Sequence, residues 1–297
     1  MRRRRPRMRT VWRIIAALLA VGFACAAYIY LTLPDVRVLR TQNPSTTAFI
    51  ELRTRQAHDK GEPPKRLQRW VTYQRISPSL IRAVIVTEDA AFWEHDGIDF
   101  QALKESMEVN LERMEFVRGA STITQQLAKN LYLSPSKNPI RKVRELLITR
   151  RLEAELSKRR ILELYLNVVE WGEGVYGAEA AARMYFRKSA LDLGPQESAL
   201  LAGALVNARL LDPGHPSARL RRRQEMILRR LGGVTLPPAA AEPVVPASAT
   251  PTAPPDAIDA PAVTPPVEAP LVLPGEVVPH SRPSGTPGKA PGTAPGG

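Results

Sequence analysis

The fold of this chain is decided by a stretch near its middle, Gly119-Ala-Ser-Thr-Ile-Thr-Gln-Gln-Leu-Ala-Lys-Asn130. Thr122 and Gln125 have the spacing of a capping box, in which each side chain binds the other residue's backbone N–H, and they predict the start of a helix. Ser121, Gln125 and Lys129 follow one another at four-residue spacing and predict a polar face beginning at the N-terminus of that helix. Free N–H groups and the positive end of the helix dipole favour an anion there, although a capping box needs no ligand.

Helical signals lie on both sides of this stretch. Ser77-Pro78 is an N-cap followed by proline at the first helical position, and the apolar stripe behind it runs on towards Phe92, with an end expected at Asp96-Gly97. Further helices are expected at about 139–156, 158–169, 178–186, 195–208 and 217–231. Only 36–39 and 48–52 look strand-like. The fold class is therefore mainly α.

A second set of polar residues precedes the capped helix. Glu88, Phe92 and His95 are separated by four and three residues, so a continuous helix would carry all three on one face with Asp89 beside them. A carboxylate among apolar and aromatic groups gains proton affinity, which suits a general base. The alternative is a helix end in which Glu88 is solvated, Asp89 pairs locally and His95 binds a backbone carbonyl.

A third set surrounds Glu145, a lone carboxylate in a basic run that contains Arg141, Lys142 and Arg144. An ion pair with Arg141 on a solvated helix face would explain it. The other interpretation is a diphosphate held by the cations, with Glu145 binding a metal or assisting the leaving group. No Walker loop or Rossmann glycine pattern accompanies these residues, so a cytoplasmic nucleotide is not the expected anion.

The N-terminus predicts a membrane anchor. Seven arginines and no acidic residue lie within residues 1–13, and residues 14–33 carry no charge. That uncharged run has about the length of 20 residues that a helix needs to cross a bilayer, and the arginines place the N-terminus in the cytoplasm and the following residues outside. The alternative is a cleaved signal peptide or a lipoprotein attached at Cys25, because small residues flank this cysteine.

The C-terminal part has the composition of a disordered tail. Residues 234–297 hold 17 of the 28 prolines and no aromatic residue, so they cannot bury a core. The folded unit is expected over residues 34–233. The net charge is +13, of which the N-terminal arginines supply seven units, and the remainder is too small to indicate a nucleic-acid binder. The single cysteine excludes a disulfide framework and a CxxC metal site.

Four motifs resemble, in order and spacing, those of the peptidoglycan glycosyltransferases of glycosyltransferase family 51, in the monofunctional form that has no transpeptidase domain. They are Glu88-Asp-Ala-Ala-Phe-Trp-Glu-His-Asp-Gly-Ile-Asp99, the stretch 119–130 quoted above, Arg141-Lys-Val-Arg-Glu145 and Lys158-Arg-Arg-Ile-Leu-Glu-Leu-Tyr-Leu-Asn167. The resemblance covers about residues 40–230, which is essentially the whole folded region.

The resemblance implies a lysozyme-like fold of two lobes, a head and a smaller jaw at about 98–118 that touches the membrane. The implied reaction polymerises lipid II with inversion and releases undecaprenyl diphosphate. The implied partners are lipid II, the growing glycan strand, the membrane and other cell-wall synthesis proteins, with no nucleic acid. The implied location is the bacterial cytoplasmic (inner) membrane, with the catalytic domain on the outer, periplasmic side. A divalent cation, Mg²⁺ or Mn²⁺, at Glu145 is the one cofactor implied, with no organic cofactor.

The resemblance also implies roles for single residues. Glu88 is implied to be the general base that removes the proton from the acceptor sugar 4-hydroxyl, and Glu145 to lie near the leaving diphosphate, directly or through the cation. The residues implied to contact donor phosphates or sugars are Ser121, Gln125, Lys129, Lys137 and Arg144. Those implied to shape the cleft are Asp89, Phe92, His95 and Gly97.

Two other functions fit parts of the sequence. A lysozyme-like glycan hydrolase or lytic transglycosylase also needs a carboxylate in a glycan groove, but it needs neither the anion face of Ser121, Gln125 and Lys129 nor a membrane anchor. A non-catalytic membrane scaffold for cell-wall enzymes would use the proline-rich tail to bind partners, but it has no need of both Glu88 and Glu145.

Overall fold

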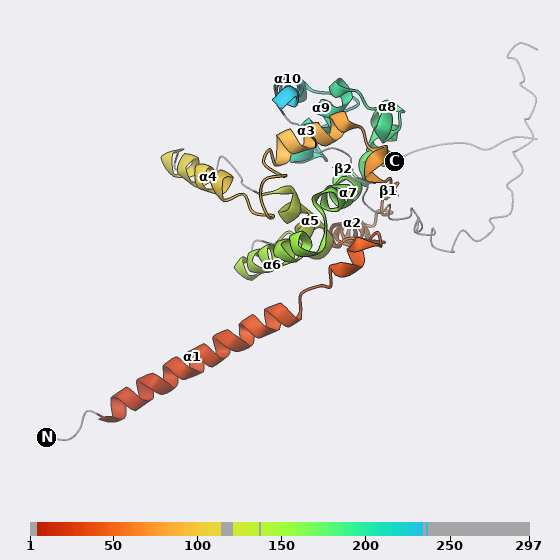
Figure 1. The fold of residues 1–297 in the computed structure, drawn as a ribbon. Helices are drawn as coiled ribbons and strands as arrows, with labels where there is room; N and C mark the ends of the chain where they lie inside the picture. Colours follow the sequence, from red (N-terminus) through yellow and green to blue (C-terminus); the bar gives the residue numbers. More distant parts are fainter. Residues whose placement is uncertain (1–4, 114–120, 137, 234–235, 237–297) are drawn as a thin grey trace, which may run out of the picture. The chain divides into compact units, whose positions relative to one another are not determined.

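A computed structural model describes residues 5–113, 121–136, 138–233 and 236 of the chain (Figure 1). Its α-helices are α1 (Arg5–Leu31), α2 (Ala48–Asp59), α3 (Pro78–Glu88), α4 (Phe100–Arg113), α5 (Ile123–Tyr132), α6 (Pro139–Glu155), α7 (Lys158–Val168), α8 (Ala178–Phe186), α9 (Pro195–Ala204) and α10 (Ala218–Arg230). Short 3-10 helices cover Arg37–Arg40, Tyr73–Arg75, Ala190–Asp192, Leu205–Asn207 and Leu231–Gly233. The mainly α class is confirmed, whereas the expected tail lies outside the described residues except for Leu236.

The described strands form one small sheet. They are β1 (Leu67–Gln68), β2 (Glu170–Gly172) and β3 (Val175–Tyr176), in the order β1-β3-β2, with β3 parallel to β1 and antiparallel to β2. Asn167, at the end of α7, is fully buried and fixes the segment that follows β1. Its side-chain nitrogen donates to the Val71 carbonyl and its side-chain oxygen accepts the Val71 N–H, both at 2.9 Å, so both ends of the buried amide are satisfied.

Two segments that were expected to be strand-like are helical, so this prediction is wrong. Most of 36–39 lies in a 3-10 helix, where the Leu39 carbonyl accepts a hydrogen bond from the buried Arg160 guanidinium (2.8 Å). The segment 48–52 opens α2, because the Thr47 hydroxyl accepts a backbone N–H of the first turn (3.1 Å) and caps the helix.

The helices pack in two groups around a common core (Figure 1). In one group α5 lies against α2, α6 and α7, and in the other α3 and α10 lie against α9. The largest buried side chains include Phe92, Tyr165 and Trp171, each at most 1% exposed, and large aromatic rings dominate the energetics of such cores. The division into a head and a jaw stays a prediction.

Helix α1 contains the segment Thr10–Leu31, which has a mean hydropathy of 2.3 and is long and apolar enough to cross a membrane. The helix ends at Leu31, two residues before the end expected from the apolar run. Leu33 belongs instead to the buried core of the folded domain. The apolar run therefore extends beyond the candidate membrane span, because its last residue, Leu33, packs in the core of the folded domain.

Helix α4 occupies most of the segment expected to form the jaw, and it exposes an apolar stripe. The apolar side chains that line a surface groove on this helix are Phe100, Leu103, Met107 and Leu111, which are between 40% and 74% exposed. Their spacing of three or four residues places them on one face. The rest of the expected jaw, residues 114–118, lies outside the described residues.

Candidate active site

Glu88 is the last residue of α3, where the chain leaves the helix. Asp89 has φ −164° and ψ 78°, which is not helical, and its N–H closes the helix on the Ile85 carbonyl at 2.9 Å. The prediction that this helix continues to His95 is therefore wrong, and His95 comes to the site from the following turn. The physical reason lies in Asp89, whose side chain forms hydrogen bonds outside the helix.

The Asp89 carboxylate joins the two segments of the site. Its Oδ2 accepts the Ile123 N–H at the start of α5 (2.9 Å), and its Oδ1 binds His95 Nε2 (2.9 Å). The side chain is only 2% exposed, and a carboxylate is favoured at a helix N-terminus, where N–H groups lack partners within the helix. Asp89 therefore holds the end of α3, which carries Glu88, against the beginning of α5.

Gly97 makes a second link between these segments. Its carbonyl accepts a hydrogen bond from the Thr122 hydroxyl, the N-cap of α5, at 2.7 Å. Gly97 has φ +82°, and a Cβ atom there would lie 2.7 Å from Thr149 Cγ2. Both the backbone conformation and the close packing require glycine at this position.

Phe92 packs in the hydrophobic core at the turn that follows α3. It is fully buried, and its ring meets Trp93 edge-on at a centroid distance of 5.0 Å. The Lys158 ammonium lies 4.6 Å from the Phe92 centroid and donates to the His95 carbonyl, so a cation–π contact and a hydrogen bond fix the turn to α7. Asp89, Phe92, His95 and Gly97 thus lie in the turn that follows Glu88, and their role in shaping the cleft stays a prediction.

Gln126, which the sequence analysis did not single out, contacts Glu88 directly. Its Nε2 donates to Glu88 Oε2 (2.8 Å), and its Oε1 accepts the Tyr165 hydroxyl (3.0 Å). Burial raises the pKa of Tyr165 well above its usual value, so the hydroxyl stays protonated and turns the amide with its NH₂ group toward the carboxylate. Among the described residues the hydrogen bond to Glu88 reaches only its Oε2 oxygen.

The surroundings of Glu88 favour its protonated form. Desolvation by burial is the largest effect and raises the pKa of Glu88 above its ordinary value, and the neighbouring Asp89 charge raises it further. The Gln126 hydrogen bond and the charges of Arg223 and Lys129 oppose this shift without cancelling it. A carboxylate with a raised pKa, next to cations, is suited to accept a proton near neutral pH.

The three residues expected on one face of α5 have different surroundings. Ser121 is exposed, just before the N-cap. Gln125 is buried, and its Oε1 accepts the Thr122 N–H (3.2 Å), so the capping box uses this oxygen. Lys129 is half-buried, with its ammonium 5.9 Å from the centroid of the Phe49 ring. The expected continuous polar face is therefore not formed, because Gln125 turns inward.

Lys129 interacts electrostatically with Glu88 and with charged residues of the basic helix α6. Burial lowers the pKa of Lys129, and the charges of Arg141 and Lys142 lower it further, whereas Glu145 and Glu88 raise it. The Lys129 ammonium thus lies within the electrostatic range of both expected catalytic carboxylates. Lys137, the other lysine expected to bind phosphate, lies outside the described residues.

Glu145 is a buried carboxylate between two cations. Its side chain is 4% exposed, Arg141 Nη1 lies 2.6 Å from Oε2, and Lys142 Nζ pairs with Oε1. The expected ion pair with Arg141 is present, but it is not on a solvated face. Because Glu145 fixes two cations beside Lys129, the group has one negative and three positive charges and suits a multiply charged anion.

Arg144 points to a different part of the chain. Its guanidinium donates to the hydroxyl and the carbonyl of Thr32, at 2.7 and 2.9 Å, just beyond α1. It was expected to contact a donor phosphate or sugar. In this structure its contacts are with the chain that leaves the apolar helix.

The donor set at Glu145 does not fit a metal site made by the protein. The described residues include no group of three or more His, Cys, Asp or Glu side chains that could hold a metal ion. Both Glu145 oxygens are already paired with cations, which would repel a divalent ion. The implied Mg²⁺ or Mn²⁺ stays a prediction.

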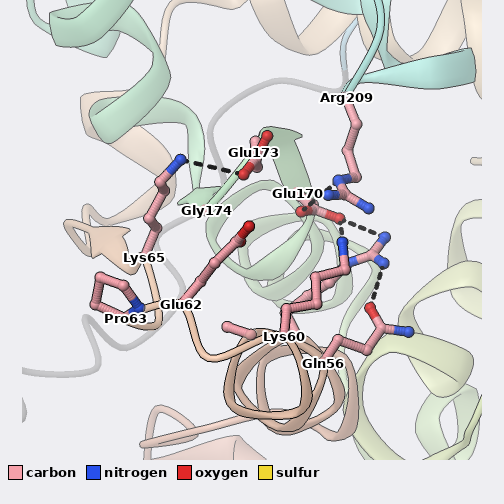
Figure 2. Close-up of a pocket in the computed structure, with 11 residues that line it drawn as sticks. Gln56, Lys60, Glu62, Pro63, Lys65, Glu170, Glu173, Gly174 and Arg209 are labelled. Carbon is pink, nitrogen blue, oxygen red and sulfur yellow. Dashed lines mark hydrogen bonds and ion pairs between the residues drawn. The ribbon is translucent and has the colours of Figure 1, made fainter. Parts of the chain in front are cut away.

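A polar pocket lies away from these residues, between α2, the β2–β3 turn and the segment after α9 (Figure 2). Glu170 accepts two hydrogen bonds from Arg53, at 3.1 and 3.0 Å, and Lys65 pairs with Glu173 at 3.2 Å. The pocket has a volume of about 60 Å³, which is room for a few water molecules. None of the expected site residues lines it.

The sequence of this chain is similar to those of known proteins. A family model described as transglycosylase matches residues 56–232. The biosynthetic peptidoglycan transglycosylase of Nitrosomonas eutropha is 44% identical over 78% of this chain and 95% of its own length. The proteins with the same name from Laribacter hongkongensis and Aromatoleum aromaticum are 41% and 54% identical, over 77% and 56% of this chain and 100% and 73% of their own lengths. The chain therefore belongs to the transglycosylase family.

Proposed function

We propose that this protein is a peptidoglycan glycosyltransferase that polymerises lipid II, with Glu88 as its general base. The observation that carries the proposal is the setting of Glu88, a half-buried carboxylate whose pKa is raised by desolvation, which is hydrogen-bonded through one oxygen and lies in the field of Lys129. Membership of the transglycosylase family supports it, since relatives that align with most of their length carry the name biosynthetic peptidoglycan transglycosylase.

The proposed step is an inverting displacement. The acceptor sugar 4-hydroxyl oxygen attacks the anomeric carbon of the growing strand, and Glu88 takes the hydroxyl proton on its free oxygen. The bond between the anomeric carbon and the diphosphate oxygen breaks, and its electron pair leaves with undecaprenyl diphosphate. Gln126 keeps the Glu88 carboxylate in one orientation by holding its other oxygen.

The cations near Glu88 would stabilise the leaving diphosphate. Lys129, Arg141 and Lys142 act on one another electrostatically, and Glu145 holds the last two by ion pairs. Fixed positive groups that face a developing negative charge lower the barrier for its departure. The role of Glu145 is then to hold these cations in place, which refines the expectation that it lies near the leaving group.

The membrane would bring enzyme and substrate together. Helix α1 has the length and hydropathy of a single-pass anchor, and the arginines before it favour a cytoplasmic N-terminus with the catalytic domain on the outer, periplasmic face of the inner membrane. The exposed apolar stripe of α4 would touch the same bilayer. Both substrates of the proposed reaction, lipid II and the growing strand, are held in that bilayer by lipid chains.

The two other functions considered above are not favoured. A glycan hydrolase needs a water molecule and a carboxylate pair, and it gives no reason for three cations gathered around Glu145 and Lys129. A non-catalytic scaffold would not need a desolvated carboxylate at Glu88.

Direct polymerisation tests the proposal. The full-length protein in detergent is incubated with lipid II, once with Mg²⁺ and once with a chelator, and the glycan products are separated by size. We expect polymer in the presence of Mg²⁺, and the chelator arm shows whether the cation is needed. Release of short sugars from finished glycan without polymer formation would indicate a hydrolase, and no reaction of a folded protein would indicate a scaffold.

The pH profile should report the titration of Glu88. The base works only when it is ionised, so the polymerisation rate should fall as pH drops through the raised pKa, with a midpoint above the value of about 4.3 for an ordinary glutamate. Gln126→Leu removes a hydrogen bond that stabilises the charged form, so its midpoint should move to higher pH. A midpoint that is unchanged in this variant would assign the acid limb to another group.

Lys129→Ala should weaken the use of lipid II far more than it lowers thermal stability, because an anion ligand is lost rather than core packing. We expect kcat/KM to fall by about 100- to 1000-fold, the loss typical of removing a fixed group that stabilises a developing negative charge. The matched variant Lys60→Ala removes an exposed lysine outside the site and should leave both properties unchanged. If Lys129→Ala lowered stability and activity together, the lysine would have a structural role.

A further inference from the structure

The chain passes from the apolar helix α1 into the folded domain without a linker. Helix α1 ends at Leu31, the Thr32 N–H donates to the Tyr28 carbonyl (3.0 Å), and Leu33 is already part of the buried core. The last carbonyls of a helix lack partners inside the helix and carry the negative end of its dipole. Groups that bind them therefore fix the position of the helix end.

Two arginines of α6 bind this helix end. Arg144 donates to the hydroxyl and the carbonyl of Thr32 (2.7 and 2.9 Å). Arg151 lies with its guanidinium 4.8 Å from the centroid of the Tyr30 ring, and it donates to the carbonyls of Tyr30 and Pro34 at 3.5 and 3.4 Å. The two arginines are seven residues apart, which is two helical turns, so they share one face of α6.

The same helix carries the proposed diphosphate-binding cations. Arg141 and Lys142 lie within one turn of Arg144, and Glu145, which pairs with both of them, is the residue after it. Helix α6 thus contacts the membrane-helix end through one set of side chains and holds the cations through another. A displacement of one set displaces the other, because a helix transmits position along its backbone.

We infer that Arg144 and Arg151 are positioning residues that clamp α6 to the exit of the membrane helix and so set where the diphosphate-binding cations stand relative to the bilayer. The inference rests on the proposed function. The diphosphate of a membrane-held substrate lies at a level fixed by its lipid, so the cations must meet it there. A substrate that is free in water can adjust to the enzyme and does not need the clamp.

The test compares two substrates with one enzyme. The full-length protein and its Arg144→Ala/Arg151→Ala variant are placed in vesicles of phosphatidylethanolamine and phosphatidylglycerol. Each is assayed with lipid II carrying its long lipid and with an analogue whose short lipid stays in water. We expect the variant to lose about 10- to 100-fold in kcat/KM on the membrane-held substrate, the loss typical of a misplacement of about 1 Å, and to stay within about twofold on the short-lipid substrate.

Other variants separate positioning from folding. Arg150→Ala removes an exposed arginine of the same helix and should behave as the wild type with both substrates. Arg144→Lys keeps the charge but loses the two-pronged contact with Thr32, and should show an intermediate loss on the membrane-held substrate only. If the double variant does not fold, Arg144→Lys and Arg151→Ala singly provide the same comparison.

Several outcomes would overturn the inference. An equal loss on both substrates would mean that Arg144 binds the diphosphate itself, and no loss on either would mean that the contacts with Thr32 and Tyr30 are incidental. A wild-type protein that polymerises neither substrate would instead refute the proposed function, so the two failures are distinguishable.

Discussion

Glu88→Gln is expected to abolish polymer formation while the protein stays folded. Gln has the shape of Glu and can still accept the Gln126 hydrogen bond at its oxygen, so the packing at the end of α3 is retained. It cannot take a proton from the acceptor hydroxyl at any accessible pH. Since general base catalysis contributes about 10²- to 10⁴-fold, kcat should fall by that amount, as measured by the appearance of glycan polymer from lipid II.

The control for this variant is Glu94→Gln, which changes an exposed carboxylate in the turn that follows α3. It should polymerise lipid II like the wild type. Thermal unfolding of both variants should coincide with that of the wild type within about 0.5 kcal/mol, the usual range for changes that leave packing intact. A Glu88→Gln protein that polymerises at more than a third of the wild-type rate would remove Glu88 from the role of base.

Asp89→Ala should have the largest effect on stability. The Asp89 side chain is 2% exposed and binds both His95 and the Ile123 N–H. Its removal leaves a buried imidazole and a helix N-terminus without their partner. A buried hydrogen-bonding group that loses its partner costs about 1 to 3 kcal/mol, so with two such groups we expect the free energy of unfolding in denaturant to fall by about 2 to 6 kcal/mol.

Two matched variants locate the effect. Asp96→Ala removes an exposed carboxylate from the same turn and should change the unfolding free energy by less than about 0.5 kcal/mol. Asp89→Asn keeps an oxygen for one of the two contacts and should cost about 1 to 2 kcal/mol, close to one lost hydrogen bond. Equal stability of Asp89→Ala and the wild type would contradict the network described here.

Helix boundaries could be predicted from the sequence wherever a cap is local. Thr122 and Gln125 form the predicted capping box, and Ser77-Pro78 begins α3 as expected, because capping depends on residues within one turn. The end of α3 could not be predicted this way. Asp89 terminates it through a bond to Ile123, 34 positions further along the chain.

The candidate site shows the same contrast between local and tertiary information. The resemblance identified Glu88, Lys129 and Glu145, which lie within one electrostatic group. Gln126 was missed, because its neighbour Gln125 has the regular spacing on the helix, whereas Gln126 is recognised only by its tertiary hydrogen bonds with Glu88 and Tyr165. The destination of Arg144 was likewise invisible, since Thr32 lies 112 residues earlier.

Two hydrogen bonds join the ends of the segment between Gly97 and Thr122, and they affect how the chain tolerates insertions or deletions there. Gly97 and Thr122 are joined by one hydrogen bond, and Asp89 and Ile123 by another, so the segment that contains α4 leaves and re-enters the domain at one fixed point. Doubling the length of a flexible loop between fixed ends costs only about 0.6 kcal/mol. A change of length between Gly97 and Thr122 is therefore expected to cost little free energy and to leave Glu88, Lys129 and Glu145 in place.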